Sequence, residues 1–197
     1  MIDPKYVASW MNYIRNYPED KRFLECFWES QMKSKKWLIN EVEKILPAPD
    51  NVIIFGGWYG VLAQMIESNF KSLQKITSVD IDPICAMTGD QLTFLDENKI
   101  YFRTMCMAAY EYIEEYDCII NTSAEHVEQE IYDRWFSNIP TGKLVIVQSN
   151  NFSYIEEHIR CSSSLDDFLT MNHITDPLYH GKIDCGGFDR YMAIFRK

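Results

Sequence analysis

The chain has 197 residues, of which 47% are hydrophobic and 24% are charged, and its formal net charge is −10 at pH 7. Such a composition is ordinary for a globular protein, and the length fits one domain with a sizeable core. Binding to nucleic-acid phosphates needs clustered Lys and Arg, so the acidic balance argues against a nucleic-acid partner. We expect a small-molecule or protein substrate instead.

The sequence holds no apolar run near the ~20 residues of a membrane span and no signal-peptide pattern at its first residues. We therefore expect a cytoplasmic protein without a membrane partner. Six cysteines are scattered without any C-x-x-C pair, which disfavours a disulfide framework or a cysteine metal cluster. The oligomeric state is not indicated by these features.

Hydrophobic periodicity predicts strands that alternate with helices along most of the chain. After a helix at residues 20–45, we predict in order a strand at 52–55, a helix at 61–70, a strand at 76–80, a helix at 84–97, a strand at 100–104, a helical segment at 108–115, a strand at 117–121, a helix at 127–136, a strand at 144–148, a helix at 164–171 and a hairpin of strands at 181–185 and 191–196. This order predicts a single domain over 1–197, with a helical N-terminal extension (1–46) and an α/β core (50–197).

A glycine turn follows the first predicted strand. Gly56, Gly57 and Gly60 enclose two bulky rings, Trp58 and Tyr59. A dinucleotide site uses G-x-G-x-x-G so that the backbone can approach a pyrophosphate. The two rings occupy that place here, which disfavours a nicotinamide oxidoreductase and favours another nucleoside cofactor.

Two carboxylates, Asp80 and Asp82, end the second predicted strand, about twenty residues after the glycine turn. In an open α/β sheet an acid at this point binds the hydroxyls of a ribose. The strand, glycine turn, helix, strand and acid therefore predict one ribose-binding site.

This combination resembles motif I and the acidic second strand of the class I S-adenosylmethionine-dependent methyltransferases. The resemblance implies an α/β, Rossmann-like seven-stranded methyltransferase sheet, mostly parallel with a C-terminal antiparallel hairpin, with helices on both faces and an N-terminal helical cap. It also implies S-adenosyl-L-methionine as the cofactor. With the loop Asn-Thr-Ser-x-Glu-His at 121–126, the chain is similar to a group of small methyltransferase-like proteins common in tailed bacteriophages.

The resemblance carries a set of expected cofactor-binding residues: Phe55, Gly56, Gly57, Trp58, Tyr59, Gly60, Asp80, Ile81, Asp82, Cys106, Met107, Asn121 and Ser123. One feature departs from the family pattern. Many relatives place an acid after the third strand to bind the adenine amino group, and residues 104–107 contain none. Backbone groups around Met107 would hold the ring instead.

The loop after the fourth predicted strand supplies three candidate catalytic residues, Asn121, Glu125 and His126. The position corresponds to the methyl-acceptor site of the family, and Glu125 or His126 could take a proton from the acceptor. As an acceptor site, this loop is expected to carry little core packing. The alternative is that Asn121 and Ser123 cap the next helix, with Glu125-His126 as its exposed first turn.

Further polar residues are expected to bind the substrate: Gln31, Lys35, Gln148, Asn150 and His158. An alternative assigns His126 and His158, with Glu125 or Glu157, to a metal site. The polar substrate wall is the preferred interpretation, and no metal is assigned.

The sequence thus predicts a methyltransferase acting on a small molecule or a protein side chain. Two alternatives stay open. One keeps the cofactor and changes the reaction to aminocarboxypropyl transfer or cofactor cleavage. The other is a non-catalytic binding or structural protein on the same fold.

Overall fold

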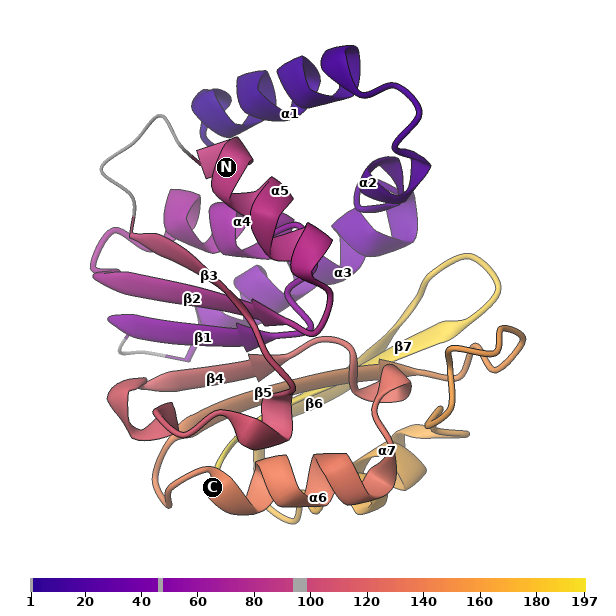
Figure 1. The fold of residues 1–197 in the computed structure, drawn as a ribbon. Coiled ribbons are helices and arrows are strands. Elements are labelled where there is room, and N and C mark those ends of the chain that lie inside the picture. The colour runs from indigo at the N-terminus through magenta and orange to yellow at the C-terminus, as the bar shows by residue number, and fades with distance from the viewer. Residues whose placement is uncertain (1, 46–47, 94–98) are drawn as a thin grey trace.

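A seven-stranded sheet forms the centre of the protein, with helices on both of its faces (Figure 1). The structure, a computed structural model, describes residues 2–45, 48–93 and 99–197. Its strands are β1 (Asn51–Phe55), β2 (Lys75–Asp80), β3 (Ile100–Thr104), β4 (Cys118–Asn121), β5 (Leu144–Asn150), β6 (Pro177–Asp184) and β7 (Asp189–Arg196). Its helices are α1 (Pro4–Asn16), α2 (Lys21–Glu25), α3 (Glu29–Val42), α4 (Val61–Asn69), α5 (Pro83–Thr93), α6 (Gln129–Asn138) and α7 (Leu165–Met171).

The strand order is β3-β2-β1-β4-β5-β7-β6. The first five strands in this order pair in parallel, and β7 pairs antiparallel with both β5 and β6. The sheet is therefore mixed and ends in an antiparallel hairpin. This arrangement is the methyltransferase Rossmann-like fold, and it confirms the fold class expected from the sequence.

Alternation along the strands builds two cores, one on each face of the sheet. In β1, Val52 and Ile54 join the core under α1, α3, α4 and α5, whereas Ile53 and Phe55 join the core over α6 and α7. Successive side chains of a strand point to opposite faces, so a strand buried on both faces is apolar throughout. β1 is accordingly a central strand between β2 and β4, and the turn that follows it lies at the carboxyl edge of the parallel strands.

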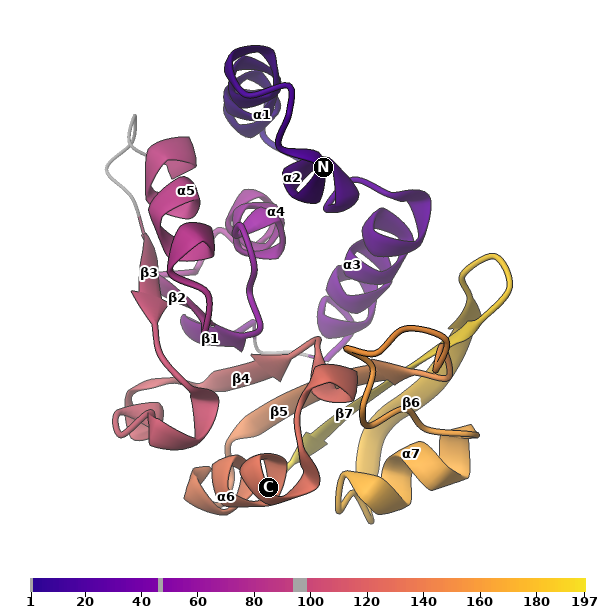
Figure 2. The same cartoon turned by 45° about the vertical axis from the view of Figure 1, so that its right-hand side comes forward.

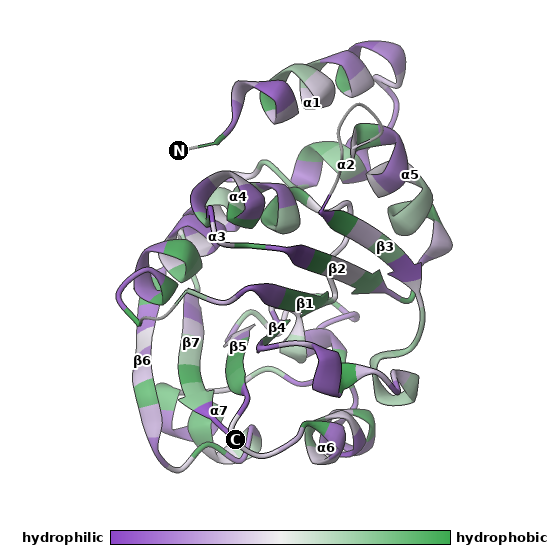
Figure 3. Ribbon diagram, turned by 90° about the vertical axis from the view of Figure 1, so that its left-hand side faces the viewer, coloured by the Kyte–Doolittle hydropathy of each residue, from purple (hydrophilic) through white to green (hydrophobic). Residues whose placement is uncertain are grey.

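The N-terminal cap consists of α1, α2 and α3, which lie on the same side as α4 and α5 (Figure 2). Asp3 caps α1 through a hydrogen bond from the Lys5 backbone N–H, and Tyr6 and Trp10 form the buried stripe of that helix. In Figure 3 the hydropathy colours of α1 alternate between purple and green accordingly. No helix in the described ranges has the length and apolar character needed to cross a bilayer.

The first predicted helix is divided in the structure. The predicted helix at 20–45 is two helices, because the chain turns at 26–28 and Trp28 takes an extended conformation (ψ 145°). Apolar spacing continues across that turn, so the change of direction was invisible in the pattern. The last turn of the helix predicted at 84–97 lies outside the described residues.

The predicted helical segment at 108–115 is instead a pair of short 3₁₀ turns, Met107–Ala109 and Ile113–Glu115. Tyr110 between them is extended (ψ 115°), and its hydroxyl lies 2.9 Å from that of Tyr116. Tyr116 in turn donates to Thr77 Oγ1 in β2. This buried chain of hydroxyls holds the segment against the sheet without a continuous helix.

Candidate functional site

The glycine turn lies where the parallel strand β1 ends, next to the end of β2. Gly56 adopts φ +64°, a conformation that glycine takes without strain. Gly57 donates its backbone N–H to the Val79 carbonyl (3.1 Å), and a Cβ added to Gly57 would stand 2.0 Å from Ser78 Oγ. The backbone of the turn therefore approaches β2 more closely than any side chain would allow.

Asp80 fixes the far side of this turn. Its Oδ2 accepts the Trp58 backbone N–H at 2.9 Å, and its Oδ1 accepts the Asp82 backbone N–H at 3.0 Å. Trp58 has a positive φ of 52°, which is uncommon for a bulky residue. Each Asp80 oxygen still has acceptor capacity, as two adjacent ribose hydroxyls would require.

Asp82 has a different role from Asp80. Its carboxylate pairs with Arg22 of α2, and its pKa is lowered by that hydrogen bond and by one from the Ile84 backbone N–H. The Arg22 guanidinium also lies 6.0 Å from the Trp58 ring centroid. Asp82 thus ties the N-terminal cap to the glycine turn, and Asp80 becomes the better ribose candidate of the two.

Several other expected cofactor residues converge on the same edge. Ser123 lies beside Gly56, with its Oγ 3.4 Å from the Gly56 carbonyl, and its backbone N–H donates to Asn121 Oδ1 at 2.9 Å. Asn121 Nδ2 approaches Met107 Sδ at 3.9 Å. Cys106, which precedes the 3₁₀ turn, is half-buried.

Three members of the expected cofactor set lie in other surroundings. Phe55 has no exposed surface, and Tyr59 is 2% exposed and packs edge-on against Phe23 with ring centroids 5.3 Å apart. Both are core residues. Ile81, in contrast, is 73% exposed beside Asp80, where an apolar side chain can cover a flat ring.

The acceptor loop is more buried than the sequence indicated. Glu125, in the 3₁₀ turn Ala124–His126, is 2% exposed and forms an ion pair with Arg190 of β7 at 3.1 Å. Asn150 Nδ2 donates to the same oxygen, Glu125 Oε1, at 2.6 Å. The expectation that this loop carries little packing is therefore wrong, because the turn folds inward over the ends of β5 and β7.

Arg190 was missed by sequence reasoning. It stands at the start of β7, directly before the apolar run 191–195, and it is 6% exposed. Besides Glu125, it donates to the Thr122 carbonyl and to Gln148 Oε1. The position of Arg190 next to an apolar strand was the one signal in the sequence that pointed to a buried charge, but Arg190 belongs to no motif.

The expected substrate residues come from α3 (Gln31 and Lys35), from the end of β5 (Gln148 and Asn150) and from the loop after β5 (His158). Ser34 Oγ donates to Gln148 Oε1 at 2.9 Å, which joins α3 to the sheet. Lys35 Nζ donates to Gln31 Oε1 at 2.9 Å. Burial, with a further contribution from the charge of Arg190, lowers the pKa of Lys35 to about 8.

Gln148 and Asn150 are each 1% exposed, and their amides bond inward. Asn150 Oδ1 accepts the Phe152 backbone N–H at 2.8 Å while its amide holds Glu125. The side chains of Gln148 and Asn150 therefore stabilise the wall of the site through internal hydrogen bonds. Lys35 and Gln31, in contrast, are half-buried at the border of the site.

His126 and His158 meet in space although 32 positions separate them. Their ring centroids are 4.6 Å apart in an edge-to-face arrangement. Glu157 contributes its backbone carbonyl, which lies 3.0 Å from His126 Nδ1, and Glu125 supplies the nearby carboxylate. Of the two carboxylates considered from the sequence, Glu125 is the one that joins the histidines.

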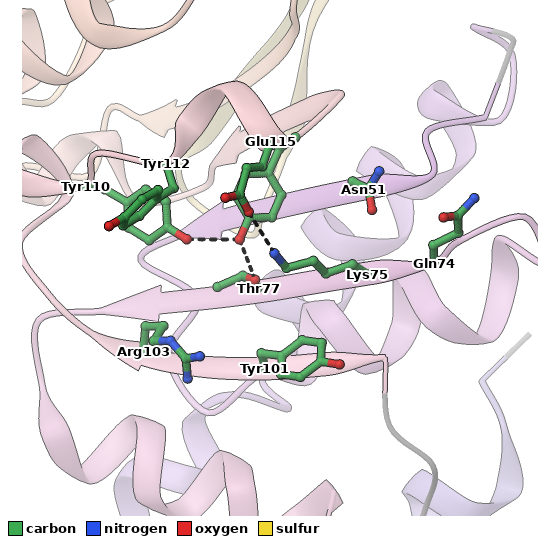
Figure 4. Close-up of a pocket in the computed structure, with 10 residues that line it drawn as sticks. Asn51, Gln74, Lys75, Thr77, Tyr101, Arg103, Tyr110, Tyr112 and Glu115 are labelled. Carbon is green, nitrogen blue, oxygen red and sulfur yellow. Dashed lines mark hydrogen bonds and ion pairs between the residues drawn. The ribbon is translucent and has the colours of Figure 1, made fainter.

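A pocket on another part of the sheet is unrelated to this edge. It lies across the face of β1, β2 and β3 beside the two 3₁₀ turns, where Lys75 pairs with Glu115 and the Tyr110, Tyr116 and Thr77 hydroxyls are linked (Figure 4). Its lining contains no residue of the glycine turn or of the acceptor loop. We assign no part of the proposed chemistry to it.

Comparison with known proteins identifies solved structures of the same fold. The chain matches the N-methyltransferase NodS from Bradyrhizobium japonicum WM9 in complex with S-adenosyl-L-homocysteine, with a TM-score of 0.71, 12% identity and coverage of 96% of this chain and 98% of that one. It matches the Burkholderia thailandensis 1,6-didemethyltoxoflavin-N1-methyltransferase, crystallised with 1,6-didemethyltoxoflavin and S-adenosylhomocysteine, with a TM-score of 0.68, 13% identity and coverage of 98% and 88%.

Human N-acetylserotonin methyltransferase in complex with S-adenosylmethionine is also similar, with a TM-score of 0.59, 17% identity and coverage of 94% of this chain and 58% of that one. A scan against protein-family models found no match, and neither did a search of curated protein sequences. At these identities the similarity shows the fold.

Proposed function

We propose that this protein is an S-adenosylmethionine-dependent methyltransferase that acts on a small molecule or a protein side chain. The observation that supports it best is Asp80 at the carboxyl edge of β1 and β2, where one carboxylate oxygen holds the glycine turn through Trp58 and the other accepts the Asp82 backbone N–H. Ligands of open α/β sheets bind at this edge. The solved structures of the same fold described above are methyltransferases holding S-adenosylmethionine or its demethylated product.

The residues at this edge fit such a ligand. Asp80 would accept hydrogen bonds from the ribose hydroxyls, and Trp58 and Ile81 offer apolar surface on either side of it. Met107 and Asn121 would line the path from the ring toward the acceptor. The cofactor supplies an electrophilic sulfonium methyl when bound, so the protein's own contribution is mainly alignment and exclusion of water.

Asn121, Glu125 and His126 form the proposed acceptor side. Asn121 would orient the acceptor with its amide, and Glu125 or His126 would take the proton that the acceptor loses. The buried amide of Asn150 and the charge of Arg190 hold Glu125 in place. Lys35 and Gln31 would contact the substrate from α3. The cytoplasmic location and the kinship with the bacteriophage group rest on the sequence and belong to the same proposal.

The proposal is tested by titrating the protein with S-adenosylhomocysteine and, separately, with NAD⁺. Binding of the first and not of the second is expected, because the half-buried Trp58 stands in the turn where a pyrophosphate would need close backbone amides. Binding of neither would refute the cofactor assignment and favour a non-catalytic role. Incubation with S-adenosylmethionine then distinguishes methyl transfer, which yields S-adenosylhomocysteine, from aminocarboxypropyl transfer or cleavage, which yields methylthioadenosine.

A further inference from the structure

Three side chains with metal-binding atoms converge where β4 and β5 end. Glu125 and His126 lie in the 3₁₀ turn after β4, and His158 lies in the loop after β5. Each offers one ligand atom, and the three atoms lie within 4.8 Å of one another. Two imidazoles and one carboxylate are a ligand set that proteins use for Zn²⁺ and related ions.

Both histidines are oriented by a hydrogen bond from one ring nitrogen to a backbone carbonyl. The Nδ1 atom of His126 lies 3.0 Å from the Glu157 carbonyl, and the Nδ1 atom of His158 contacts the Phe152 carbonyl. A carbonyl only accepts, so both Nδ1 atoms carry a hydrogen, and in the neutral imidazole the Nε2 atom is then the one with a lone pair for a metal. Metal-ligating histidines are oriented by this kind of outer hydrogen bond.

The carboxylate of Glu125 provides an independent observation. The side chain is 2% exposed, and its Oε1 is used by Arg190 and Asn150. Its Oε2 is buried and has no hydrogen-bond partner in the part of the chain that the structure describes. An unsatisfied buried carboxylate oxygen is costly, and a cation between it and the two histidines would remove that cost.

We propose that Glu125, His126 and His158 bind a divalent first-row transition-metal ion, with Zn²⁺ the best match to this ligand set. Metal–ligand bonds of about 2.0–2.2 Å separate neighbouring ligands by about 3.0–3.6 Å, so two atoms as far apart as 4.8 Å would close in by about 1.2–1.8 Å on binding. His126 is exposed and can rotate to do so. The remaining coordination positions are open to water or to an acceptor.

Metal binding in this form does not depend on the methyltransferase proposal. If both are right, the ion lies on the acceptor side of the site, because Glu125 and His126 follow the carboxyl end of β4. The residues would then act as ligands, and the lowered pKa of a hydroxyl bound to the ion would replace direct proton transfer to His126.

The experiment titrates Co²⁺, a spectroscopic substitute for Zn²⁺, into the full chain without cofactor, followed by calorimetry and visible absorption. We expect one Co²⁺ per chain. His126→Ala and His158→Ala should each weaken binding by at least about tenfold, the lower end of what even an outer-shell change costs a metal site. His180→Ala is the matched control, because His180 is an exposed histidine of β6 and should leave the affinity unchanged.

Absence of stoichiometric Co²⁺ binding would overturn the proposal, as would unchanged affinity in the His126→Ala/His158→Ala double variant. A sulfur-to-cobalt charge-transfer band would also overturn it, because it would assign the ion to cysteines such as the half-buried Cys161. S-adenosylhomocysteine affinity is measured on the same samples. Loss of cofactor binding with intact Co²⁺ binding would refute the proposed function and leave the metal site standing.

Discussion

Replacement of Asp80 by Asn tests the cofactor site with the smallest change of shape. Asp80 accepts one backbone N–H on each oxygen, at 2.9 and 3.0 Å. Asn keeps one acceptor and loses the charge, so one of these hydrogen bonds and the strong bond to the ribose hydroxyls are lost. A hydrogen bond to a charged group is worth about 1.5–3 kcal/mol. The expected loss of S-adenosylhomocysteine affinity is therefore about 10- to 150-fold.

Calorimetric titration of both aspartate variants provides the measurement and its control. Asp82→Asn removes the pair with Arg22, which is largely a surface contact worth ~1 kcal/mol or less. We expect it to change cofactor affinity by less than about fivefold. Equal affinity of the wild type and Asp80→Asn, or an equal loss in Asp82→Asn, would refute the assignment of the ribose to Asp80.

Three other substitutions follow from the same edge of the sheet. Gly57→Ala should abolish S-adenosylhomocysteine binding in a titration, because the added Cβ would stand 2.0 Å from Ser78 Oγ. The double variant Gly57→Ala/Ser78→Ala should recover part of the binding. If it recovers none, the clash with Ser78 is not the cause. Glu125→Gln should lower the melting temperature by roughly 6–20 °C, because breaking a buried ion pair leaves Arg190 uncompensated at a cost of about 3–5 kcal/mol. An unchanged melting curve would show that the pair is not maintained. The pKa of Lys35 is about 8 in the folded protein and 10.5 in the unfolded chain. Between pH 8 and pH 10.5 the unfolded chain therefore binds more protons than the folded protein, and the free energy of unfolding should rise with pH over this range. Urea unfolding of the wild type and Lys35→Met at several pH values should show this rise in the wild type alone, and parallel curves would refute the shift.

Most of the fold could be predicted from local patterns, because strands buried on both faces are apolar and are separated by turn residues. The sequence Val-Ile-Ile-Phe at 52–55 and the hairpin at the C-terminus are examples, and the structure contains both. The 3₁₀ turns around Tyr110 were mistaken for a helix, since their spacing is helical over a few residues and the hydroxyl chain to Thr77 is a long-range contact.

The candidate site could be predicted only where its residues lie a short, fixed distance apart in the sequence. The glycine turn and Asp80 lie in adjacent strands with a fixed spacing, so their meeting followed from the sequence. Glu125 and Arg190 are 65 positions apart, and their pairing depends on β7 lying next to β5. The separate roles of Asp80 and Asp82 likewise depend on Arg22 in a helix that no motif connects to them.

The contacts of α3 with the far end of the chain also bear on how the protein assembles during synthesis. Ser34 bonds to Gln148 across 114 positions, and Trp37 bonds to Tyr179 across 142. At about 5–20 residues per second, a ribosome needs roughly 7–28 s to extend the nascent chain from Trp37 to Tyr179. During that interval the side of α3 that faces the hairpin has no partner. A polypeptide released before β6 and β7 are made would expose that side, including Trp37, to chaperones and to other unfinished chains.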